Sequence, residues 1–470
     1  MSVRRKELAL IGNGMVAQRL LDRLHERGGF DRYAVTVFDE ESDAGYNRIL
    51  LSHVLGGDEP DSIVTKPAAW YAEAGVRLVA RSSVRRIDTS ARRVVADGGE
   101  YPYDLVVLAT GSSPVVPPLD GISDGNGELK RGVFVYRTLE GCLRMRAHAR
   151  PGDNAVVLGG GLLGLEAAKV LADRGLHVTV VHLAGSLMDA QLDSVGGELL
   201  RQQVLRSGLF VRTGQTLDSI LGDKEVEGVV LDDGKTLAAD IVVMACGIRP
   251  RVEVARASGI PINKGVLVND TLATEIPGVY ALGECAEHRG RTYGLVAPGW
   301  EQADVLADVL TGARPQARYL GSKLYARLKA VGIEVASIGA LHAELESDDV
   351  VQVIETKKQS YRKLVIRDSQ LIGAILVGNT DAAATLIQTF DRGDPLPDDP
   401  LESLCTPAFM AAAGAVDAIV CNCNKVARAT IVDAITSGAK TMDTLCEATR
   451  AGTGCGSCRS DLIDLISRFA

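Results

Sequence analysis

Residues 7–17 read ELALIGNGMVA and residues 155–166 read AVVLGGGLLGLE, so one pattern occurs twice in the chain. In each copy an apolar strand runs into a glycine-rich turn, G-x-G-x-x-A or G-x-G-x-x-G, and then into a helical pattern. The glycines let the backbone approach a pyrophosphate, which lies at the N-terminus of the helix. The sequence therefore predicts an α/β fold with two Rossmann-like dinucleotide-binding domains.

The first copy continues into a second apolar strand, residues 34–38, which ends in three acidic residues. An acid at this position can hold a ribose 2′-hydroxyl. The candidate binding residues of this copy are Gly12, Gly14, Ala17, Asp39 and Glu40.

In the second copy the following strand, residues 178–181, ends in His182 instead of an acid, and neither Arg nor Lys follows closely. The ribose 2′-position is therefore poorly specified, and His182 is either a nucleotide contact or a surface histidine. The candidate residues of this copy are Gly159, Gly161, Leu162, Leu163, Gly164, Glu166 and His182.

Two further strings, LVVLATG at 105–111 and TEIPGVYALGE at 274–284, read as strands ending in glycine-containing turns. They resemble the flavin-binding strings of the glutathione reductase and rubredoxin reductase superfamily. The resemblance implies that the first copy binds FAD and the second binds NAD(P)H. It implies that Glu284 bonds the ribityl chain, and that a helix beginning near Pro298 points its positive end at the flavin. The implied site adds Arg48, Ala109, Thr110, Gly111, Gly283, Glu284 and Pro298.

Disulfide reductases of this superfamily carry a redox cysteine pair, but the corresponding stretch here reads YNRILLS at 46–52. Electrons are therefore expected to leave the flavin by another route. NADH is the expected donor because no Arg is placed to hold a 2′-phosphate. A protonated His182 could hold one, so NADPH stays the alternative.

Four cysteines near the end of the sequence form a C-x-C pair and a C-x-x-C pair, namely Cys421, Cys423, Cys455 and Cys458. Four thiolates in two tight pairs can hold one iron–sulfur cluster or one structural zinc. The strings CNCNKV and AGTGCGSC resemble the bacterioferritin-associated-ferredoxin-like (BFD-like) [2Fe–2S] domain, which implies a cluster. A zinc knuckle with the same ligands is the alternative.

Composition narrows the class of partner. The net charge is −9, with 46% hydrophobic and 4% aromatic residues, which argues against binding to nucleic acid or to an anionic membrane. The nine cysteines and the lack of a signal peptide or long apolar run favour a reduced, cytoplasmic protein.

A chain of 470 residues is expected to form several domains. We predict an FAD-binding domain at 1–118 and 248–314, an NAD(P)H-binding domain at 119–247, an α+β interface domain at 315–392, a linker at 393–412 and a small helical BFD-like domain at 413–470.

The whole pattern resembles the N-terminal half of assimilatory nitrite reductase large subunits and the electron-transfer subunits of bacterial assimilatory nitrate reductases. No cysteines follow Cys458 for a sirohaem region. We therefore expect an NAD(P)H-dependent oxidoreductase that passes electrons through FAD and a [2Fe–2S] cluster to a separate molybdenum nitrate reductase chain. The alternatives are a reductase for a separate nitrite reductase, rubredoxin or oxygenase, and an amine- or opine-type flavin dehydrogenase.

Overall fold

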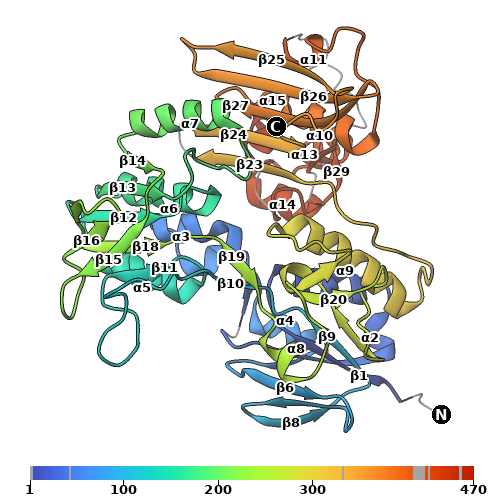
Figure 1. Ribbon diagram of the computed structural model, residues 1–470. Helices are drawn as coiled ribbons and strands as arrows, with labels where there is room; N and C mark the ends of the chain where they lie inside the picture. Colours follow the sequence, from blue (N-terminus) through green and yellow to red (C-terminus); the bar gives the residue numbers. More distant parts are fainter. Residues whose placement is uncertain (1–3, 42–43, 331–332, 406–418, 422–423, 455–457) are drawn as a thin grey trace. The chain divides into compact units, whose positions relative to one another are not determined.

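The computed structural model describes residues 4–41, 44–330, 333–405, 419–421, 424–454 and 458–470 (Figure 1). Contacts divide the chain into two compact units. The first unit comprises Met1–Leu51, Glu59–Val115 and Ile248–Ser322, and the second comprises Ser52–Asp58, Val116–Gly247 and Lys323–Ala470.

The first unit is built on a five-stranded parallel sheet. In spatial order its strands are β21 (Val279–Ala281), β9 (Leu105–Leu108), β1 (Lys6–Ile11), β2 (Tyr33–Phe38) and β5 (Arg77–Val79). The central strands are almost entirely apolar because helices and loops cover both faces of the sheet. On one face, α1 (Met15–Glu26) and α9 (Val296–Thr311) contribute leucine and alanine side chains to a common core.

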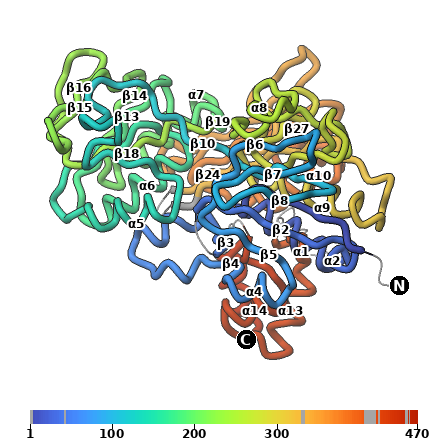
Figure 2. The backbone as a smooth tube through the Cα atoms, turned by 90° about the horizontal axis from the view of Figure 1, so that it is seen from below, coloured from blue at the N-terminus to red at the C-terminus, as the bar shows by residue number. Residues whose placement is uncertain are grey.

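Smaller elements complete this unit. The antiparallel strands β6, β7 and β8 lie side by side in Figures 1 and 2 and cover the other face of the parallel sheet. Their bounds and those of the remaining elements are β6 (Val84–Asp88), β7 (Arg93–Ala96), β8 (Gly99–Pro102), β3 (Gly45–Tyr46), β4 (Val64–Lys66), β10 (Ser112–Pro114), β19 (Ile248–Pro250), β20 (Val266–Val268), β22 (Ala286–His288), α2 (Gly29–Arg32), α4 (Ala68–Glu73), α8 (Glu253–Ala257), η1 (Arg48–Leu50), η2 (Pro60–Ile63) and η3 (Gly283–Cys285).

The second unit contains a second parallel sheet of five strands. In spatial order they are β11 (Val133–Val135), β18 (Ile241–Met244), β12 (Asn154–Leu158), β13 (His177–His182) and β14 (Phe210–Thr213). The associated elements are α3 (Leu51–Gly56), α5 (Leu139–His148), α6 (Leu162–Asp173), α7 (Ser194–Arg206), β15 (Leu217–Leu221), β16 (Gly228–Leu231) and β17 (Thr236–Ala238). The order of strand, glycine turn and helix follows the prediction from the second fingerprint.

An antiparallel sheet in the second unit corresponds to the predicted interface domain. Its strands are β23 (Tyr325–Ala330), β24 (Ile333–Gly339), β27 (Gln370–Val377), β26 (Ser360–Arg367) and β25 (Asp349–Glu355), and α10 (Ala383–Arg392) packs on it. The first part of the predicted linker lies against this sheet, because the Leu396 amide donates to Ser369 O at 2.8 Å. In addition, the Arg362 guanidinium donates to Leu404 O at 2.7 Å, next to α11 (Glu402–Cys405).

The cysteine-bearing segment forms a small, mainly helical bundle. Its elements are β28 (Ile419–Cys421), β29 (Val426–Ala427), α13 (Arg428–Thr436), α14 (Met442–Thr449) and α15 (Arg459–Phe469). Buried Ile431, Leu445 and Leu462 form its apolar centre. Thr441 caps α14 with a reciprocal capping box, which fixes the start of that helix. None of the helices in the described ranges combines the length and apolar character needed to cross a membrane.

Candidate functional site

The first fingerprint places two glycines with different roles at the tip of β1. Gly12 has φ +109°, and a Cβ there would lie 2.2 Å from Ala109 O, so the protein itself requires glycine at this position. Gly14 has φ −70°, and apart from its chain neighbours no atom of the described residues lies within 4 Å of its Cβ position. The fold therefore gives no reason for glycine at position 14, and the space above it is open at the N-terminus of α1.

The residue between these glycines joins the turn to the end of β2. The Asn13 amide donates to Asp39 Oδ2 at 2.9 Å, and the Tyr71 hydroxyl donates to Asn13 Oδ1 at 2.7 Å. Burial raises the pKa of Asp39, although the Glu41 amide also donates to its carboxylate. Asn13 and Tyr71 were not among the sequence candidates, and nothing in the local pattern around Tyr71 marks it.

The other acid predicted at the end of β2, Glu40, is partly exposed and forms an ion pair with Arg251. Arg48 donates to Glu41 at 2.6 Å and lies over the Tyr46 ring at 5.2 Å. The candidates Glu40 and Arg48 thus form ion pairs, whereas Asp39 is hydrogen-bonded to Asn13 in the glycine turn.

The strings after β9 and β21 meet in the same unit. The Ser112 hydroxyl donates to Glu284 Oε2 at 2.5 Å, and the Thr110 hydroxyl donates to Arg251 O at 2.8 Å. The Gly283 amide donates to Gln302 Oε1 on α9 at 2.7 Å. The structure therefore brings Ala109–Gly111, Glu284 and the helix that contains Pro298 to the same region as the first fingerprint.

Close helix packing defines this region further. A Cβ at Gly299 would lie 2.5 Å from Val16 Cγ2, so glycine there lets α9 pack tightly against α1. Neither helix has a side-chain N-cap or an acid in its first turn, so no side chain of the helix itself compensates its positive end. Gln302 Nε2 is buried with no hydrogen-bond partner among the described residues. Open space over Gly14, uncapped amides and this buried donor fit a dinucleotide with an anionic pyrophosphate.

The second fingerprint repeats this division of roles. Gly159 has φ +119°, and a Cβ there would lie 2.2 Å from Ala245 O. A Cβ at Gly164 would lie 2.0 Å from Gly159 O, so glycine allows α6 to pack on the turn. Gly161 has φ −83°, and in the part of the chain that the structure describes only its chain neighbours lie within 4 Å of its Cβ position. Leu162 and Leu163 begin α6, which has no side-chain cap and no acid in its first turn. This site too fits a pyrophosphate.

His182 is the last residue of β13, as predicted, and both of its ring nitrogens are bonded within the protein. Its Nδ1 accepts from the Gly160 amide at 3.1 Å, and its Nε2 lies 3.0 Å from Asp189 Oδ1. Asp189 was not a sequence candidate, because its position in a loop seven residues further on carries no recognisable signal.

Glu166 lies on the second turn of α6 and is the most perturbed carboxyl among the candidates. Burial raises its pKa from 4.5 to about 7. Its environment includes the fully buried Tyr136, whose own pKa is raised by burial and by the charge of Glu166. A carboxyl of this kind is protonated in part of the molecules at neutral pH, and its charge state is coupled to stability.

We expect Glu166→Gln to remove a pH-dependent loss of stability. Because the folded-state pKa is raised to about 7, the folded protein binds this proton more tightly than the unfolded chain. The free energy of unfolding of the wild type should therefore fall between about pH 4.5 and about pH 7, by on the order of 3 kcal/mol. Glutamine cannot ionise, so the variant should match the wild type near pH 4.5 and exceed it at pH 8.

The check is denaturant unfolding at several pH values, with Glu227→Gln as a control that removes an exposed carboxylate from the same unit. The control should follow the wild-type pH profile. Parallel profiles for wild type and Glu166→Gln would show that Glu166 carries no such coupling.

The cysteine candidates are only partly within the described residues, since Cys423 and Cys455 lie outside them. Cys421 ends β28 and Cys458 precedes α15, and their exposed fractions are 0% and 2%. The Asn424 amide donates to Arg450 O at 2.6 Å and to Thr453 Oγ1 at 3.1 Å. These bonds hold the segment after the first cysteine pair against the segment before the second. Two buried thiols on adjoining segments, each in a cysteine pair, fit a four-thiolate cluster.

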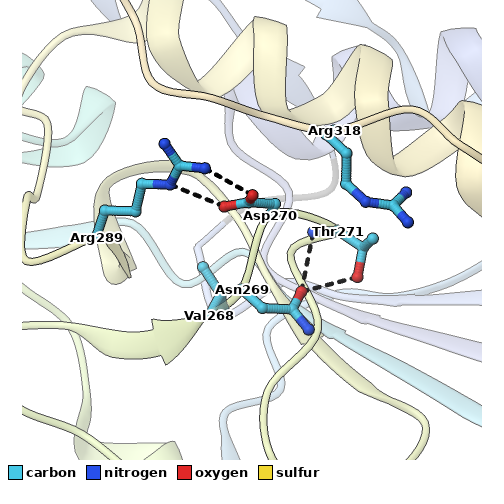
Figure 3. Close-up of a pocket in the computed structure, with 6 residues that line it drawn as sticks. All are labelled: Val268, Asn269, Asp270, Thr271, Arg289 and Arg318. Atoms are coloured by element: carbon cyan, nitrogen blue, oxygen red, sulfur yellow. Dashed lines mark hydrogen bonds and ion pairs between the residues drawn. The ribbon is translucent and has the colours of Figure 1, made fainter.

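The first unit has a surface hollow of about 530 Å³, and none of the residues that line it is a predicted site residue (Figure 3). Its walls include Asp270, which accepts from Arg289 at 2.9 and 2.7 Å and lies 2.8 Å from His288 Nε2. Hydrogen bonds from Arg289 lower the pKa of Asp270 to about 2. Asp270 and Arg289 neutralise each other, whereas Arg318 donates to the carbonyl oxygens of Pro315 and Ala317. We assign no ligand to this hollow.

Comparison with known families gives three matches. Residues 6–305 match the family described as pyridine nucleotide-disulphide oxidoreductase, and residues 325–393 match the rubredoxin NAD+ reductase C-terminal domain. Residues 419–468 match the BFD-like [2Fe-2S] binding domain. The three matches follow the order of the predicted flavoprotein core, interface domain and cluster domain.

Two relatives from Bacillus subtilis (strain 168) match almost the whole chain. One is a nitrite reductase [NAD(P)H], 38% identical over 97% of this chain and 56% of its own length. The other is an assimilatory nitrate reductase electron transfer subunit, 34% identical over 99% of this chain and 60% of its own length. The chain thus spans somewhat more than half the length of these two relatives.

Several solved structures have a fold similar to that of this chain. A covalent putidaredoxin reductase–putidaredoxin complex matches with a TM-score of 0.76 and 21% identity, covering 88% of this chain and 100% of that chain. NADH:rubredoxin oxidoreductase from Clostridium acetobutylicum matches with a TM-score of 0.69 and 20% identity, covering 85% of this chain and 99% of that chain. At these identities the likeness concerns the fold alone.

Proposed function

The chain belongs to the pyridine nucleotide-disulphide oxidoreductase family and carries a BFD-like [2Fe-2S] binding domain, and we propose that it is the electron-transfer component of an assimilatory nitrate-reducing system. At the level of the family it is an NAD(P)H-dependent oxidoreductase with FAD and a [2Fe–2S] cluster. The finer assignment, to nitrate reduction with a separate molybdenum chain as acceptor, is the proposal.

The observation that carries the proposal is the repeated pair of glycines. Gly12 and Gly159 are required by the backbone, whereas Gly14 and Gly161 have ordinary φ angles and empty space at their Cβ positions. Glycine at the latter two positions is explained by a ligand that approaches the backbone. Two such open glycine turns and a cysteine-bearing domain lie on one chain. Together they support a path in which electrons pass from NAD(P)H through FAD to a cluster.

A bound FAD would supply the chemistry that couples two-electron donation by NAD(P)H to the one-electron [2Fe–2S] cluster. The protein's part is to bind and orient. The backbone at Gly14 and the α1 N-terminus would hold the FAD pyrophosphate, and Glu284 would hold the ribityl hydroxyls. Ser112 fixes the Glu284 carboxylate by its hydrogen bond of 2.5 Å. The N-terminus of α9 would place its positive end toward the flavin ring and favour negative charge there.

In the second unit, the backbone at Gly161 and the α6 N-terminus would hold the pyrophosphate of NAD(P)H. In the cluster domain, Cys421, Cys423, Cys455 and Cys458 would supply four thiolates. Asn424 orients the two cysteine-bearing segments relative to each other through Arg450 O.

Two acceptors are supported by the relatives, and an experiment separates them. The purified chain is combined with NADH and either a molybdenum nitrate reductase chain with nitrate or a sirohaem nitrite reductase with nitrite. We expect sustained NADH-dependent nitrite formation in the first mixture. Turnover in the second mixture alone would assign the chain to nitrite reduction. Turnover in neither mixture would contradict both assignments.

A further inference from the structure

The group that would read the ribose 2′-position of the nicotinamide nucleotide is not at its usual place in the sequence. In dinucleotide-binding units an acid at the end of the second strand accepts a hydrogen bond from the 2′-hydroxyl of NAD, and an arginine accommodates the 2′-phosphate of NADP. Here β13, the second strand of the unit, ends in His182. A hydrogen-bond partner of this histidine supplies the negative charge that the end of the strand lacks.

The hydrogen bonds of His182 determine where its proton is. The Gly160 amide can only donate, so Nδ1, which lies 3.1 Å from it, must accept and carries no proton. The proton of the neutral ring is then on Nε2, which donates to Asp189 Oδ1 at 3.0 Å. Protonation of Nδ1 would break the bond to Gly160. The geometry therefore does not favour His182 as the positive charge that holds a 2′-phosphate.

Asp189 is held rigidly beside the glycine turn by its chain neighbours. The Met188 amide donates to Gly160 O at 3.0 Å, and the Leu192 amide donates to Met188 O at 2.8 Å. The Leu187 and Met188 side chains are 0% and 1% exposed. A Cβ at Gly160 would lie 2.5 Å from Leu187 Cδ2, so the loop packs directly on the fingerprint. These contacts therefore fix the position of Asp189 next to the end of β13.

The charge at this position is negative and accessible. The Asp189 side chain is 53% exposed, and within the described ranges its second oxygen, Oδ2, accepts no hydrogen bond. Arg212 on the neighbouring strand β14 pairs with Val181, whereas Thr213 pairs with His182. Because side chains alternate along a strand, Arg212 points to the face opposite His182. The His182 side of β13 therefore presents a carboxylate and not the guanidinium of Arg212.

We propose that Asp189 is the residue that selects NADH over NADPH. Its carboxylate accepts a hydrogen bond from the ribose 2′-hydroxyl and repels a 2′-phosphate, while His182 orients it through the Nε2 bond. This inference rests on the proposed NAD(P)H-dependent function, and it names the nucleotide and the residue that reads it.

The test is the binding of NAD+ and NADP+ to the FAD-loaded protein by titration calorimetry, which does not depend on turnover. Asp189→Asn removes the charge and keeps an oxygen that can accept from His182. The ratio of the two Kd values should shift toward NADP+ by at least about tenfold, because a like charge next to the phosphate has been removed. Asp223→Asn, an exposed neutralisation in the same unit, should leave the ratio unchanged.

Ionic strength provides a second readout that a merely structural role would not move. The gain in NADP+ affinity of Asp189→Asn over wild type should shrink as salt is raised, because exposed charges are screened within about 8 Å at physiological salt. A ratio within about twofold of wild type in Asp189→Asn, or a wild type that prefers NADP+, would overturn the inference. Failure of the wild type to bind either nucleotide would instead contradict the proposed function.

Discussion

Replacing Cys458 with serine is expected to remove the iron–sulfur cluster and to leave FAD bound. Cys458 is almost fully buried at the start of α15, on the segment that Asn424 joins to the first cysteine pair. A serine hydroxyl is a poor substitute for a thiolate ligand, so the cluster should be lost or become unstable. The residues predicted to bind FAD lie in the other compact unit, so FAD content should stay at the wild-type level.

The functional consequence should depend on the acceptor. Reduction of an artificial dye by NADH, which can draw electrons directly from the flavin, should survive in Cys458→Ser. Electron transfer to the protein acceptor should fall by at least about tenfold, because the cluster is the proposed exit. Iron analysis, absorption spectra and the two activities together check the prediction.

A nearby cysteine outside the predicted ligand set provides the matched control. Cys446 on α14 lies close to this region, since its Sγ is 3.2 Å from the Cβ position of Gly452. Cys446→Ser should keep the cluster and the activity. Normal electron transfer to the partner in Cys458→Ser would show that the cluster has only a structural role. Zinc in place of iron in the wild type would equally contradict the proposed electron exit.

Gly14→Val should yield a folded protein that lacks FAD. The Cβ position at Gly14 is open and its φ is −70°. The substitution should therefore destabilise the protein without FAD by only about 1 kcal/mol. The valine side chain would occupy the space through which the pyrophosphate approaches the backbone. We expect FAD content to fall by at least about tenfold, together with all NADH-dependent activity.

The equivalent substitution in the second fingerprint is the control for this prediction. Gly161 has the same open surroundings, so Gly161→Val should keep its FAD and lose NADH oxidation. Absorption spectra and nucleotide titrations distinguish the two variants. Wild-type FAD content in Gly14→Val would show that the first fingerprint is not the flavin site.

The repeated fingerprint could be predicted from the sequence because its signals are local. A strand, a glycine turn and a helix follow one another directly, over residues 6–26 and 154–173, so α1 and α6 begin where the pattern places them. The strand expected over residues 274–284 was wrong in extent, since β21 covers only Val279–Ala281. Pro277 has no amide hydrogen and Gly278 has φ +82°, so a turn precedes the short strand.

The contacts that complete the sites could not be predicted, because they join residues distant in sequence. Asn13 bonds to Tyr71, and Asn424 to Arg450. Asp189 supplies a charge where the pattern shows only His182. The ligand roles of Cys423 and Cys455 stay a prediction, since both lie outside the described residues. The domain boundaries and the assigned binding residues likewise stay predictions.

The central claim is that electrons from NADH reach the cluster through the flavin of the same chain. An anaerobic titration of the purified protein with NADH, followed by absorption for FAD and by paramagnetic resonance for the cluster, tests it directly. We predict that the flavin bands bleach first and that the signal of a reduced [2Fe–2S] cluster then develops. A cluster that stays oxidised under excess NADH, while the flavin is fully reduced, would contradict the account.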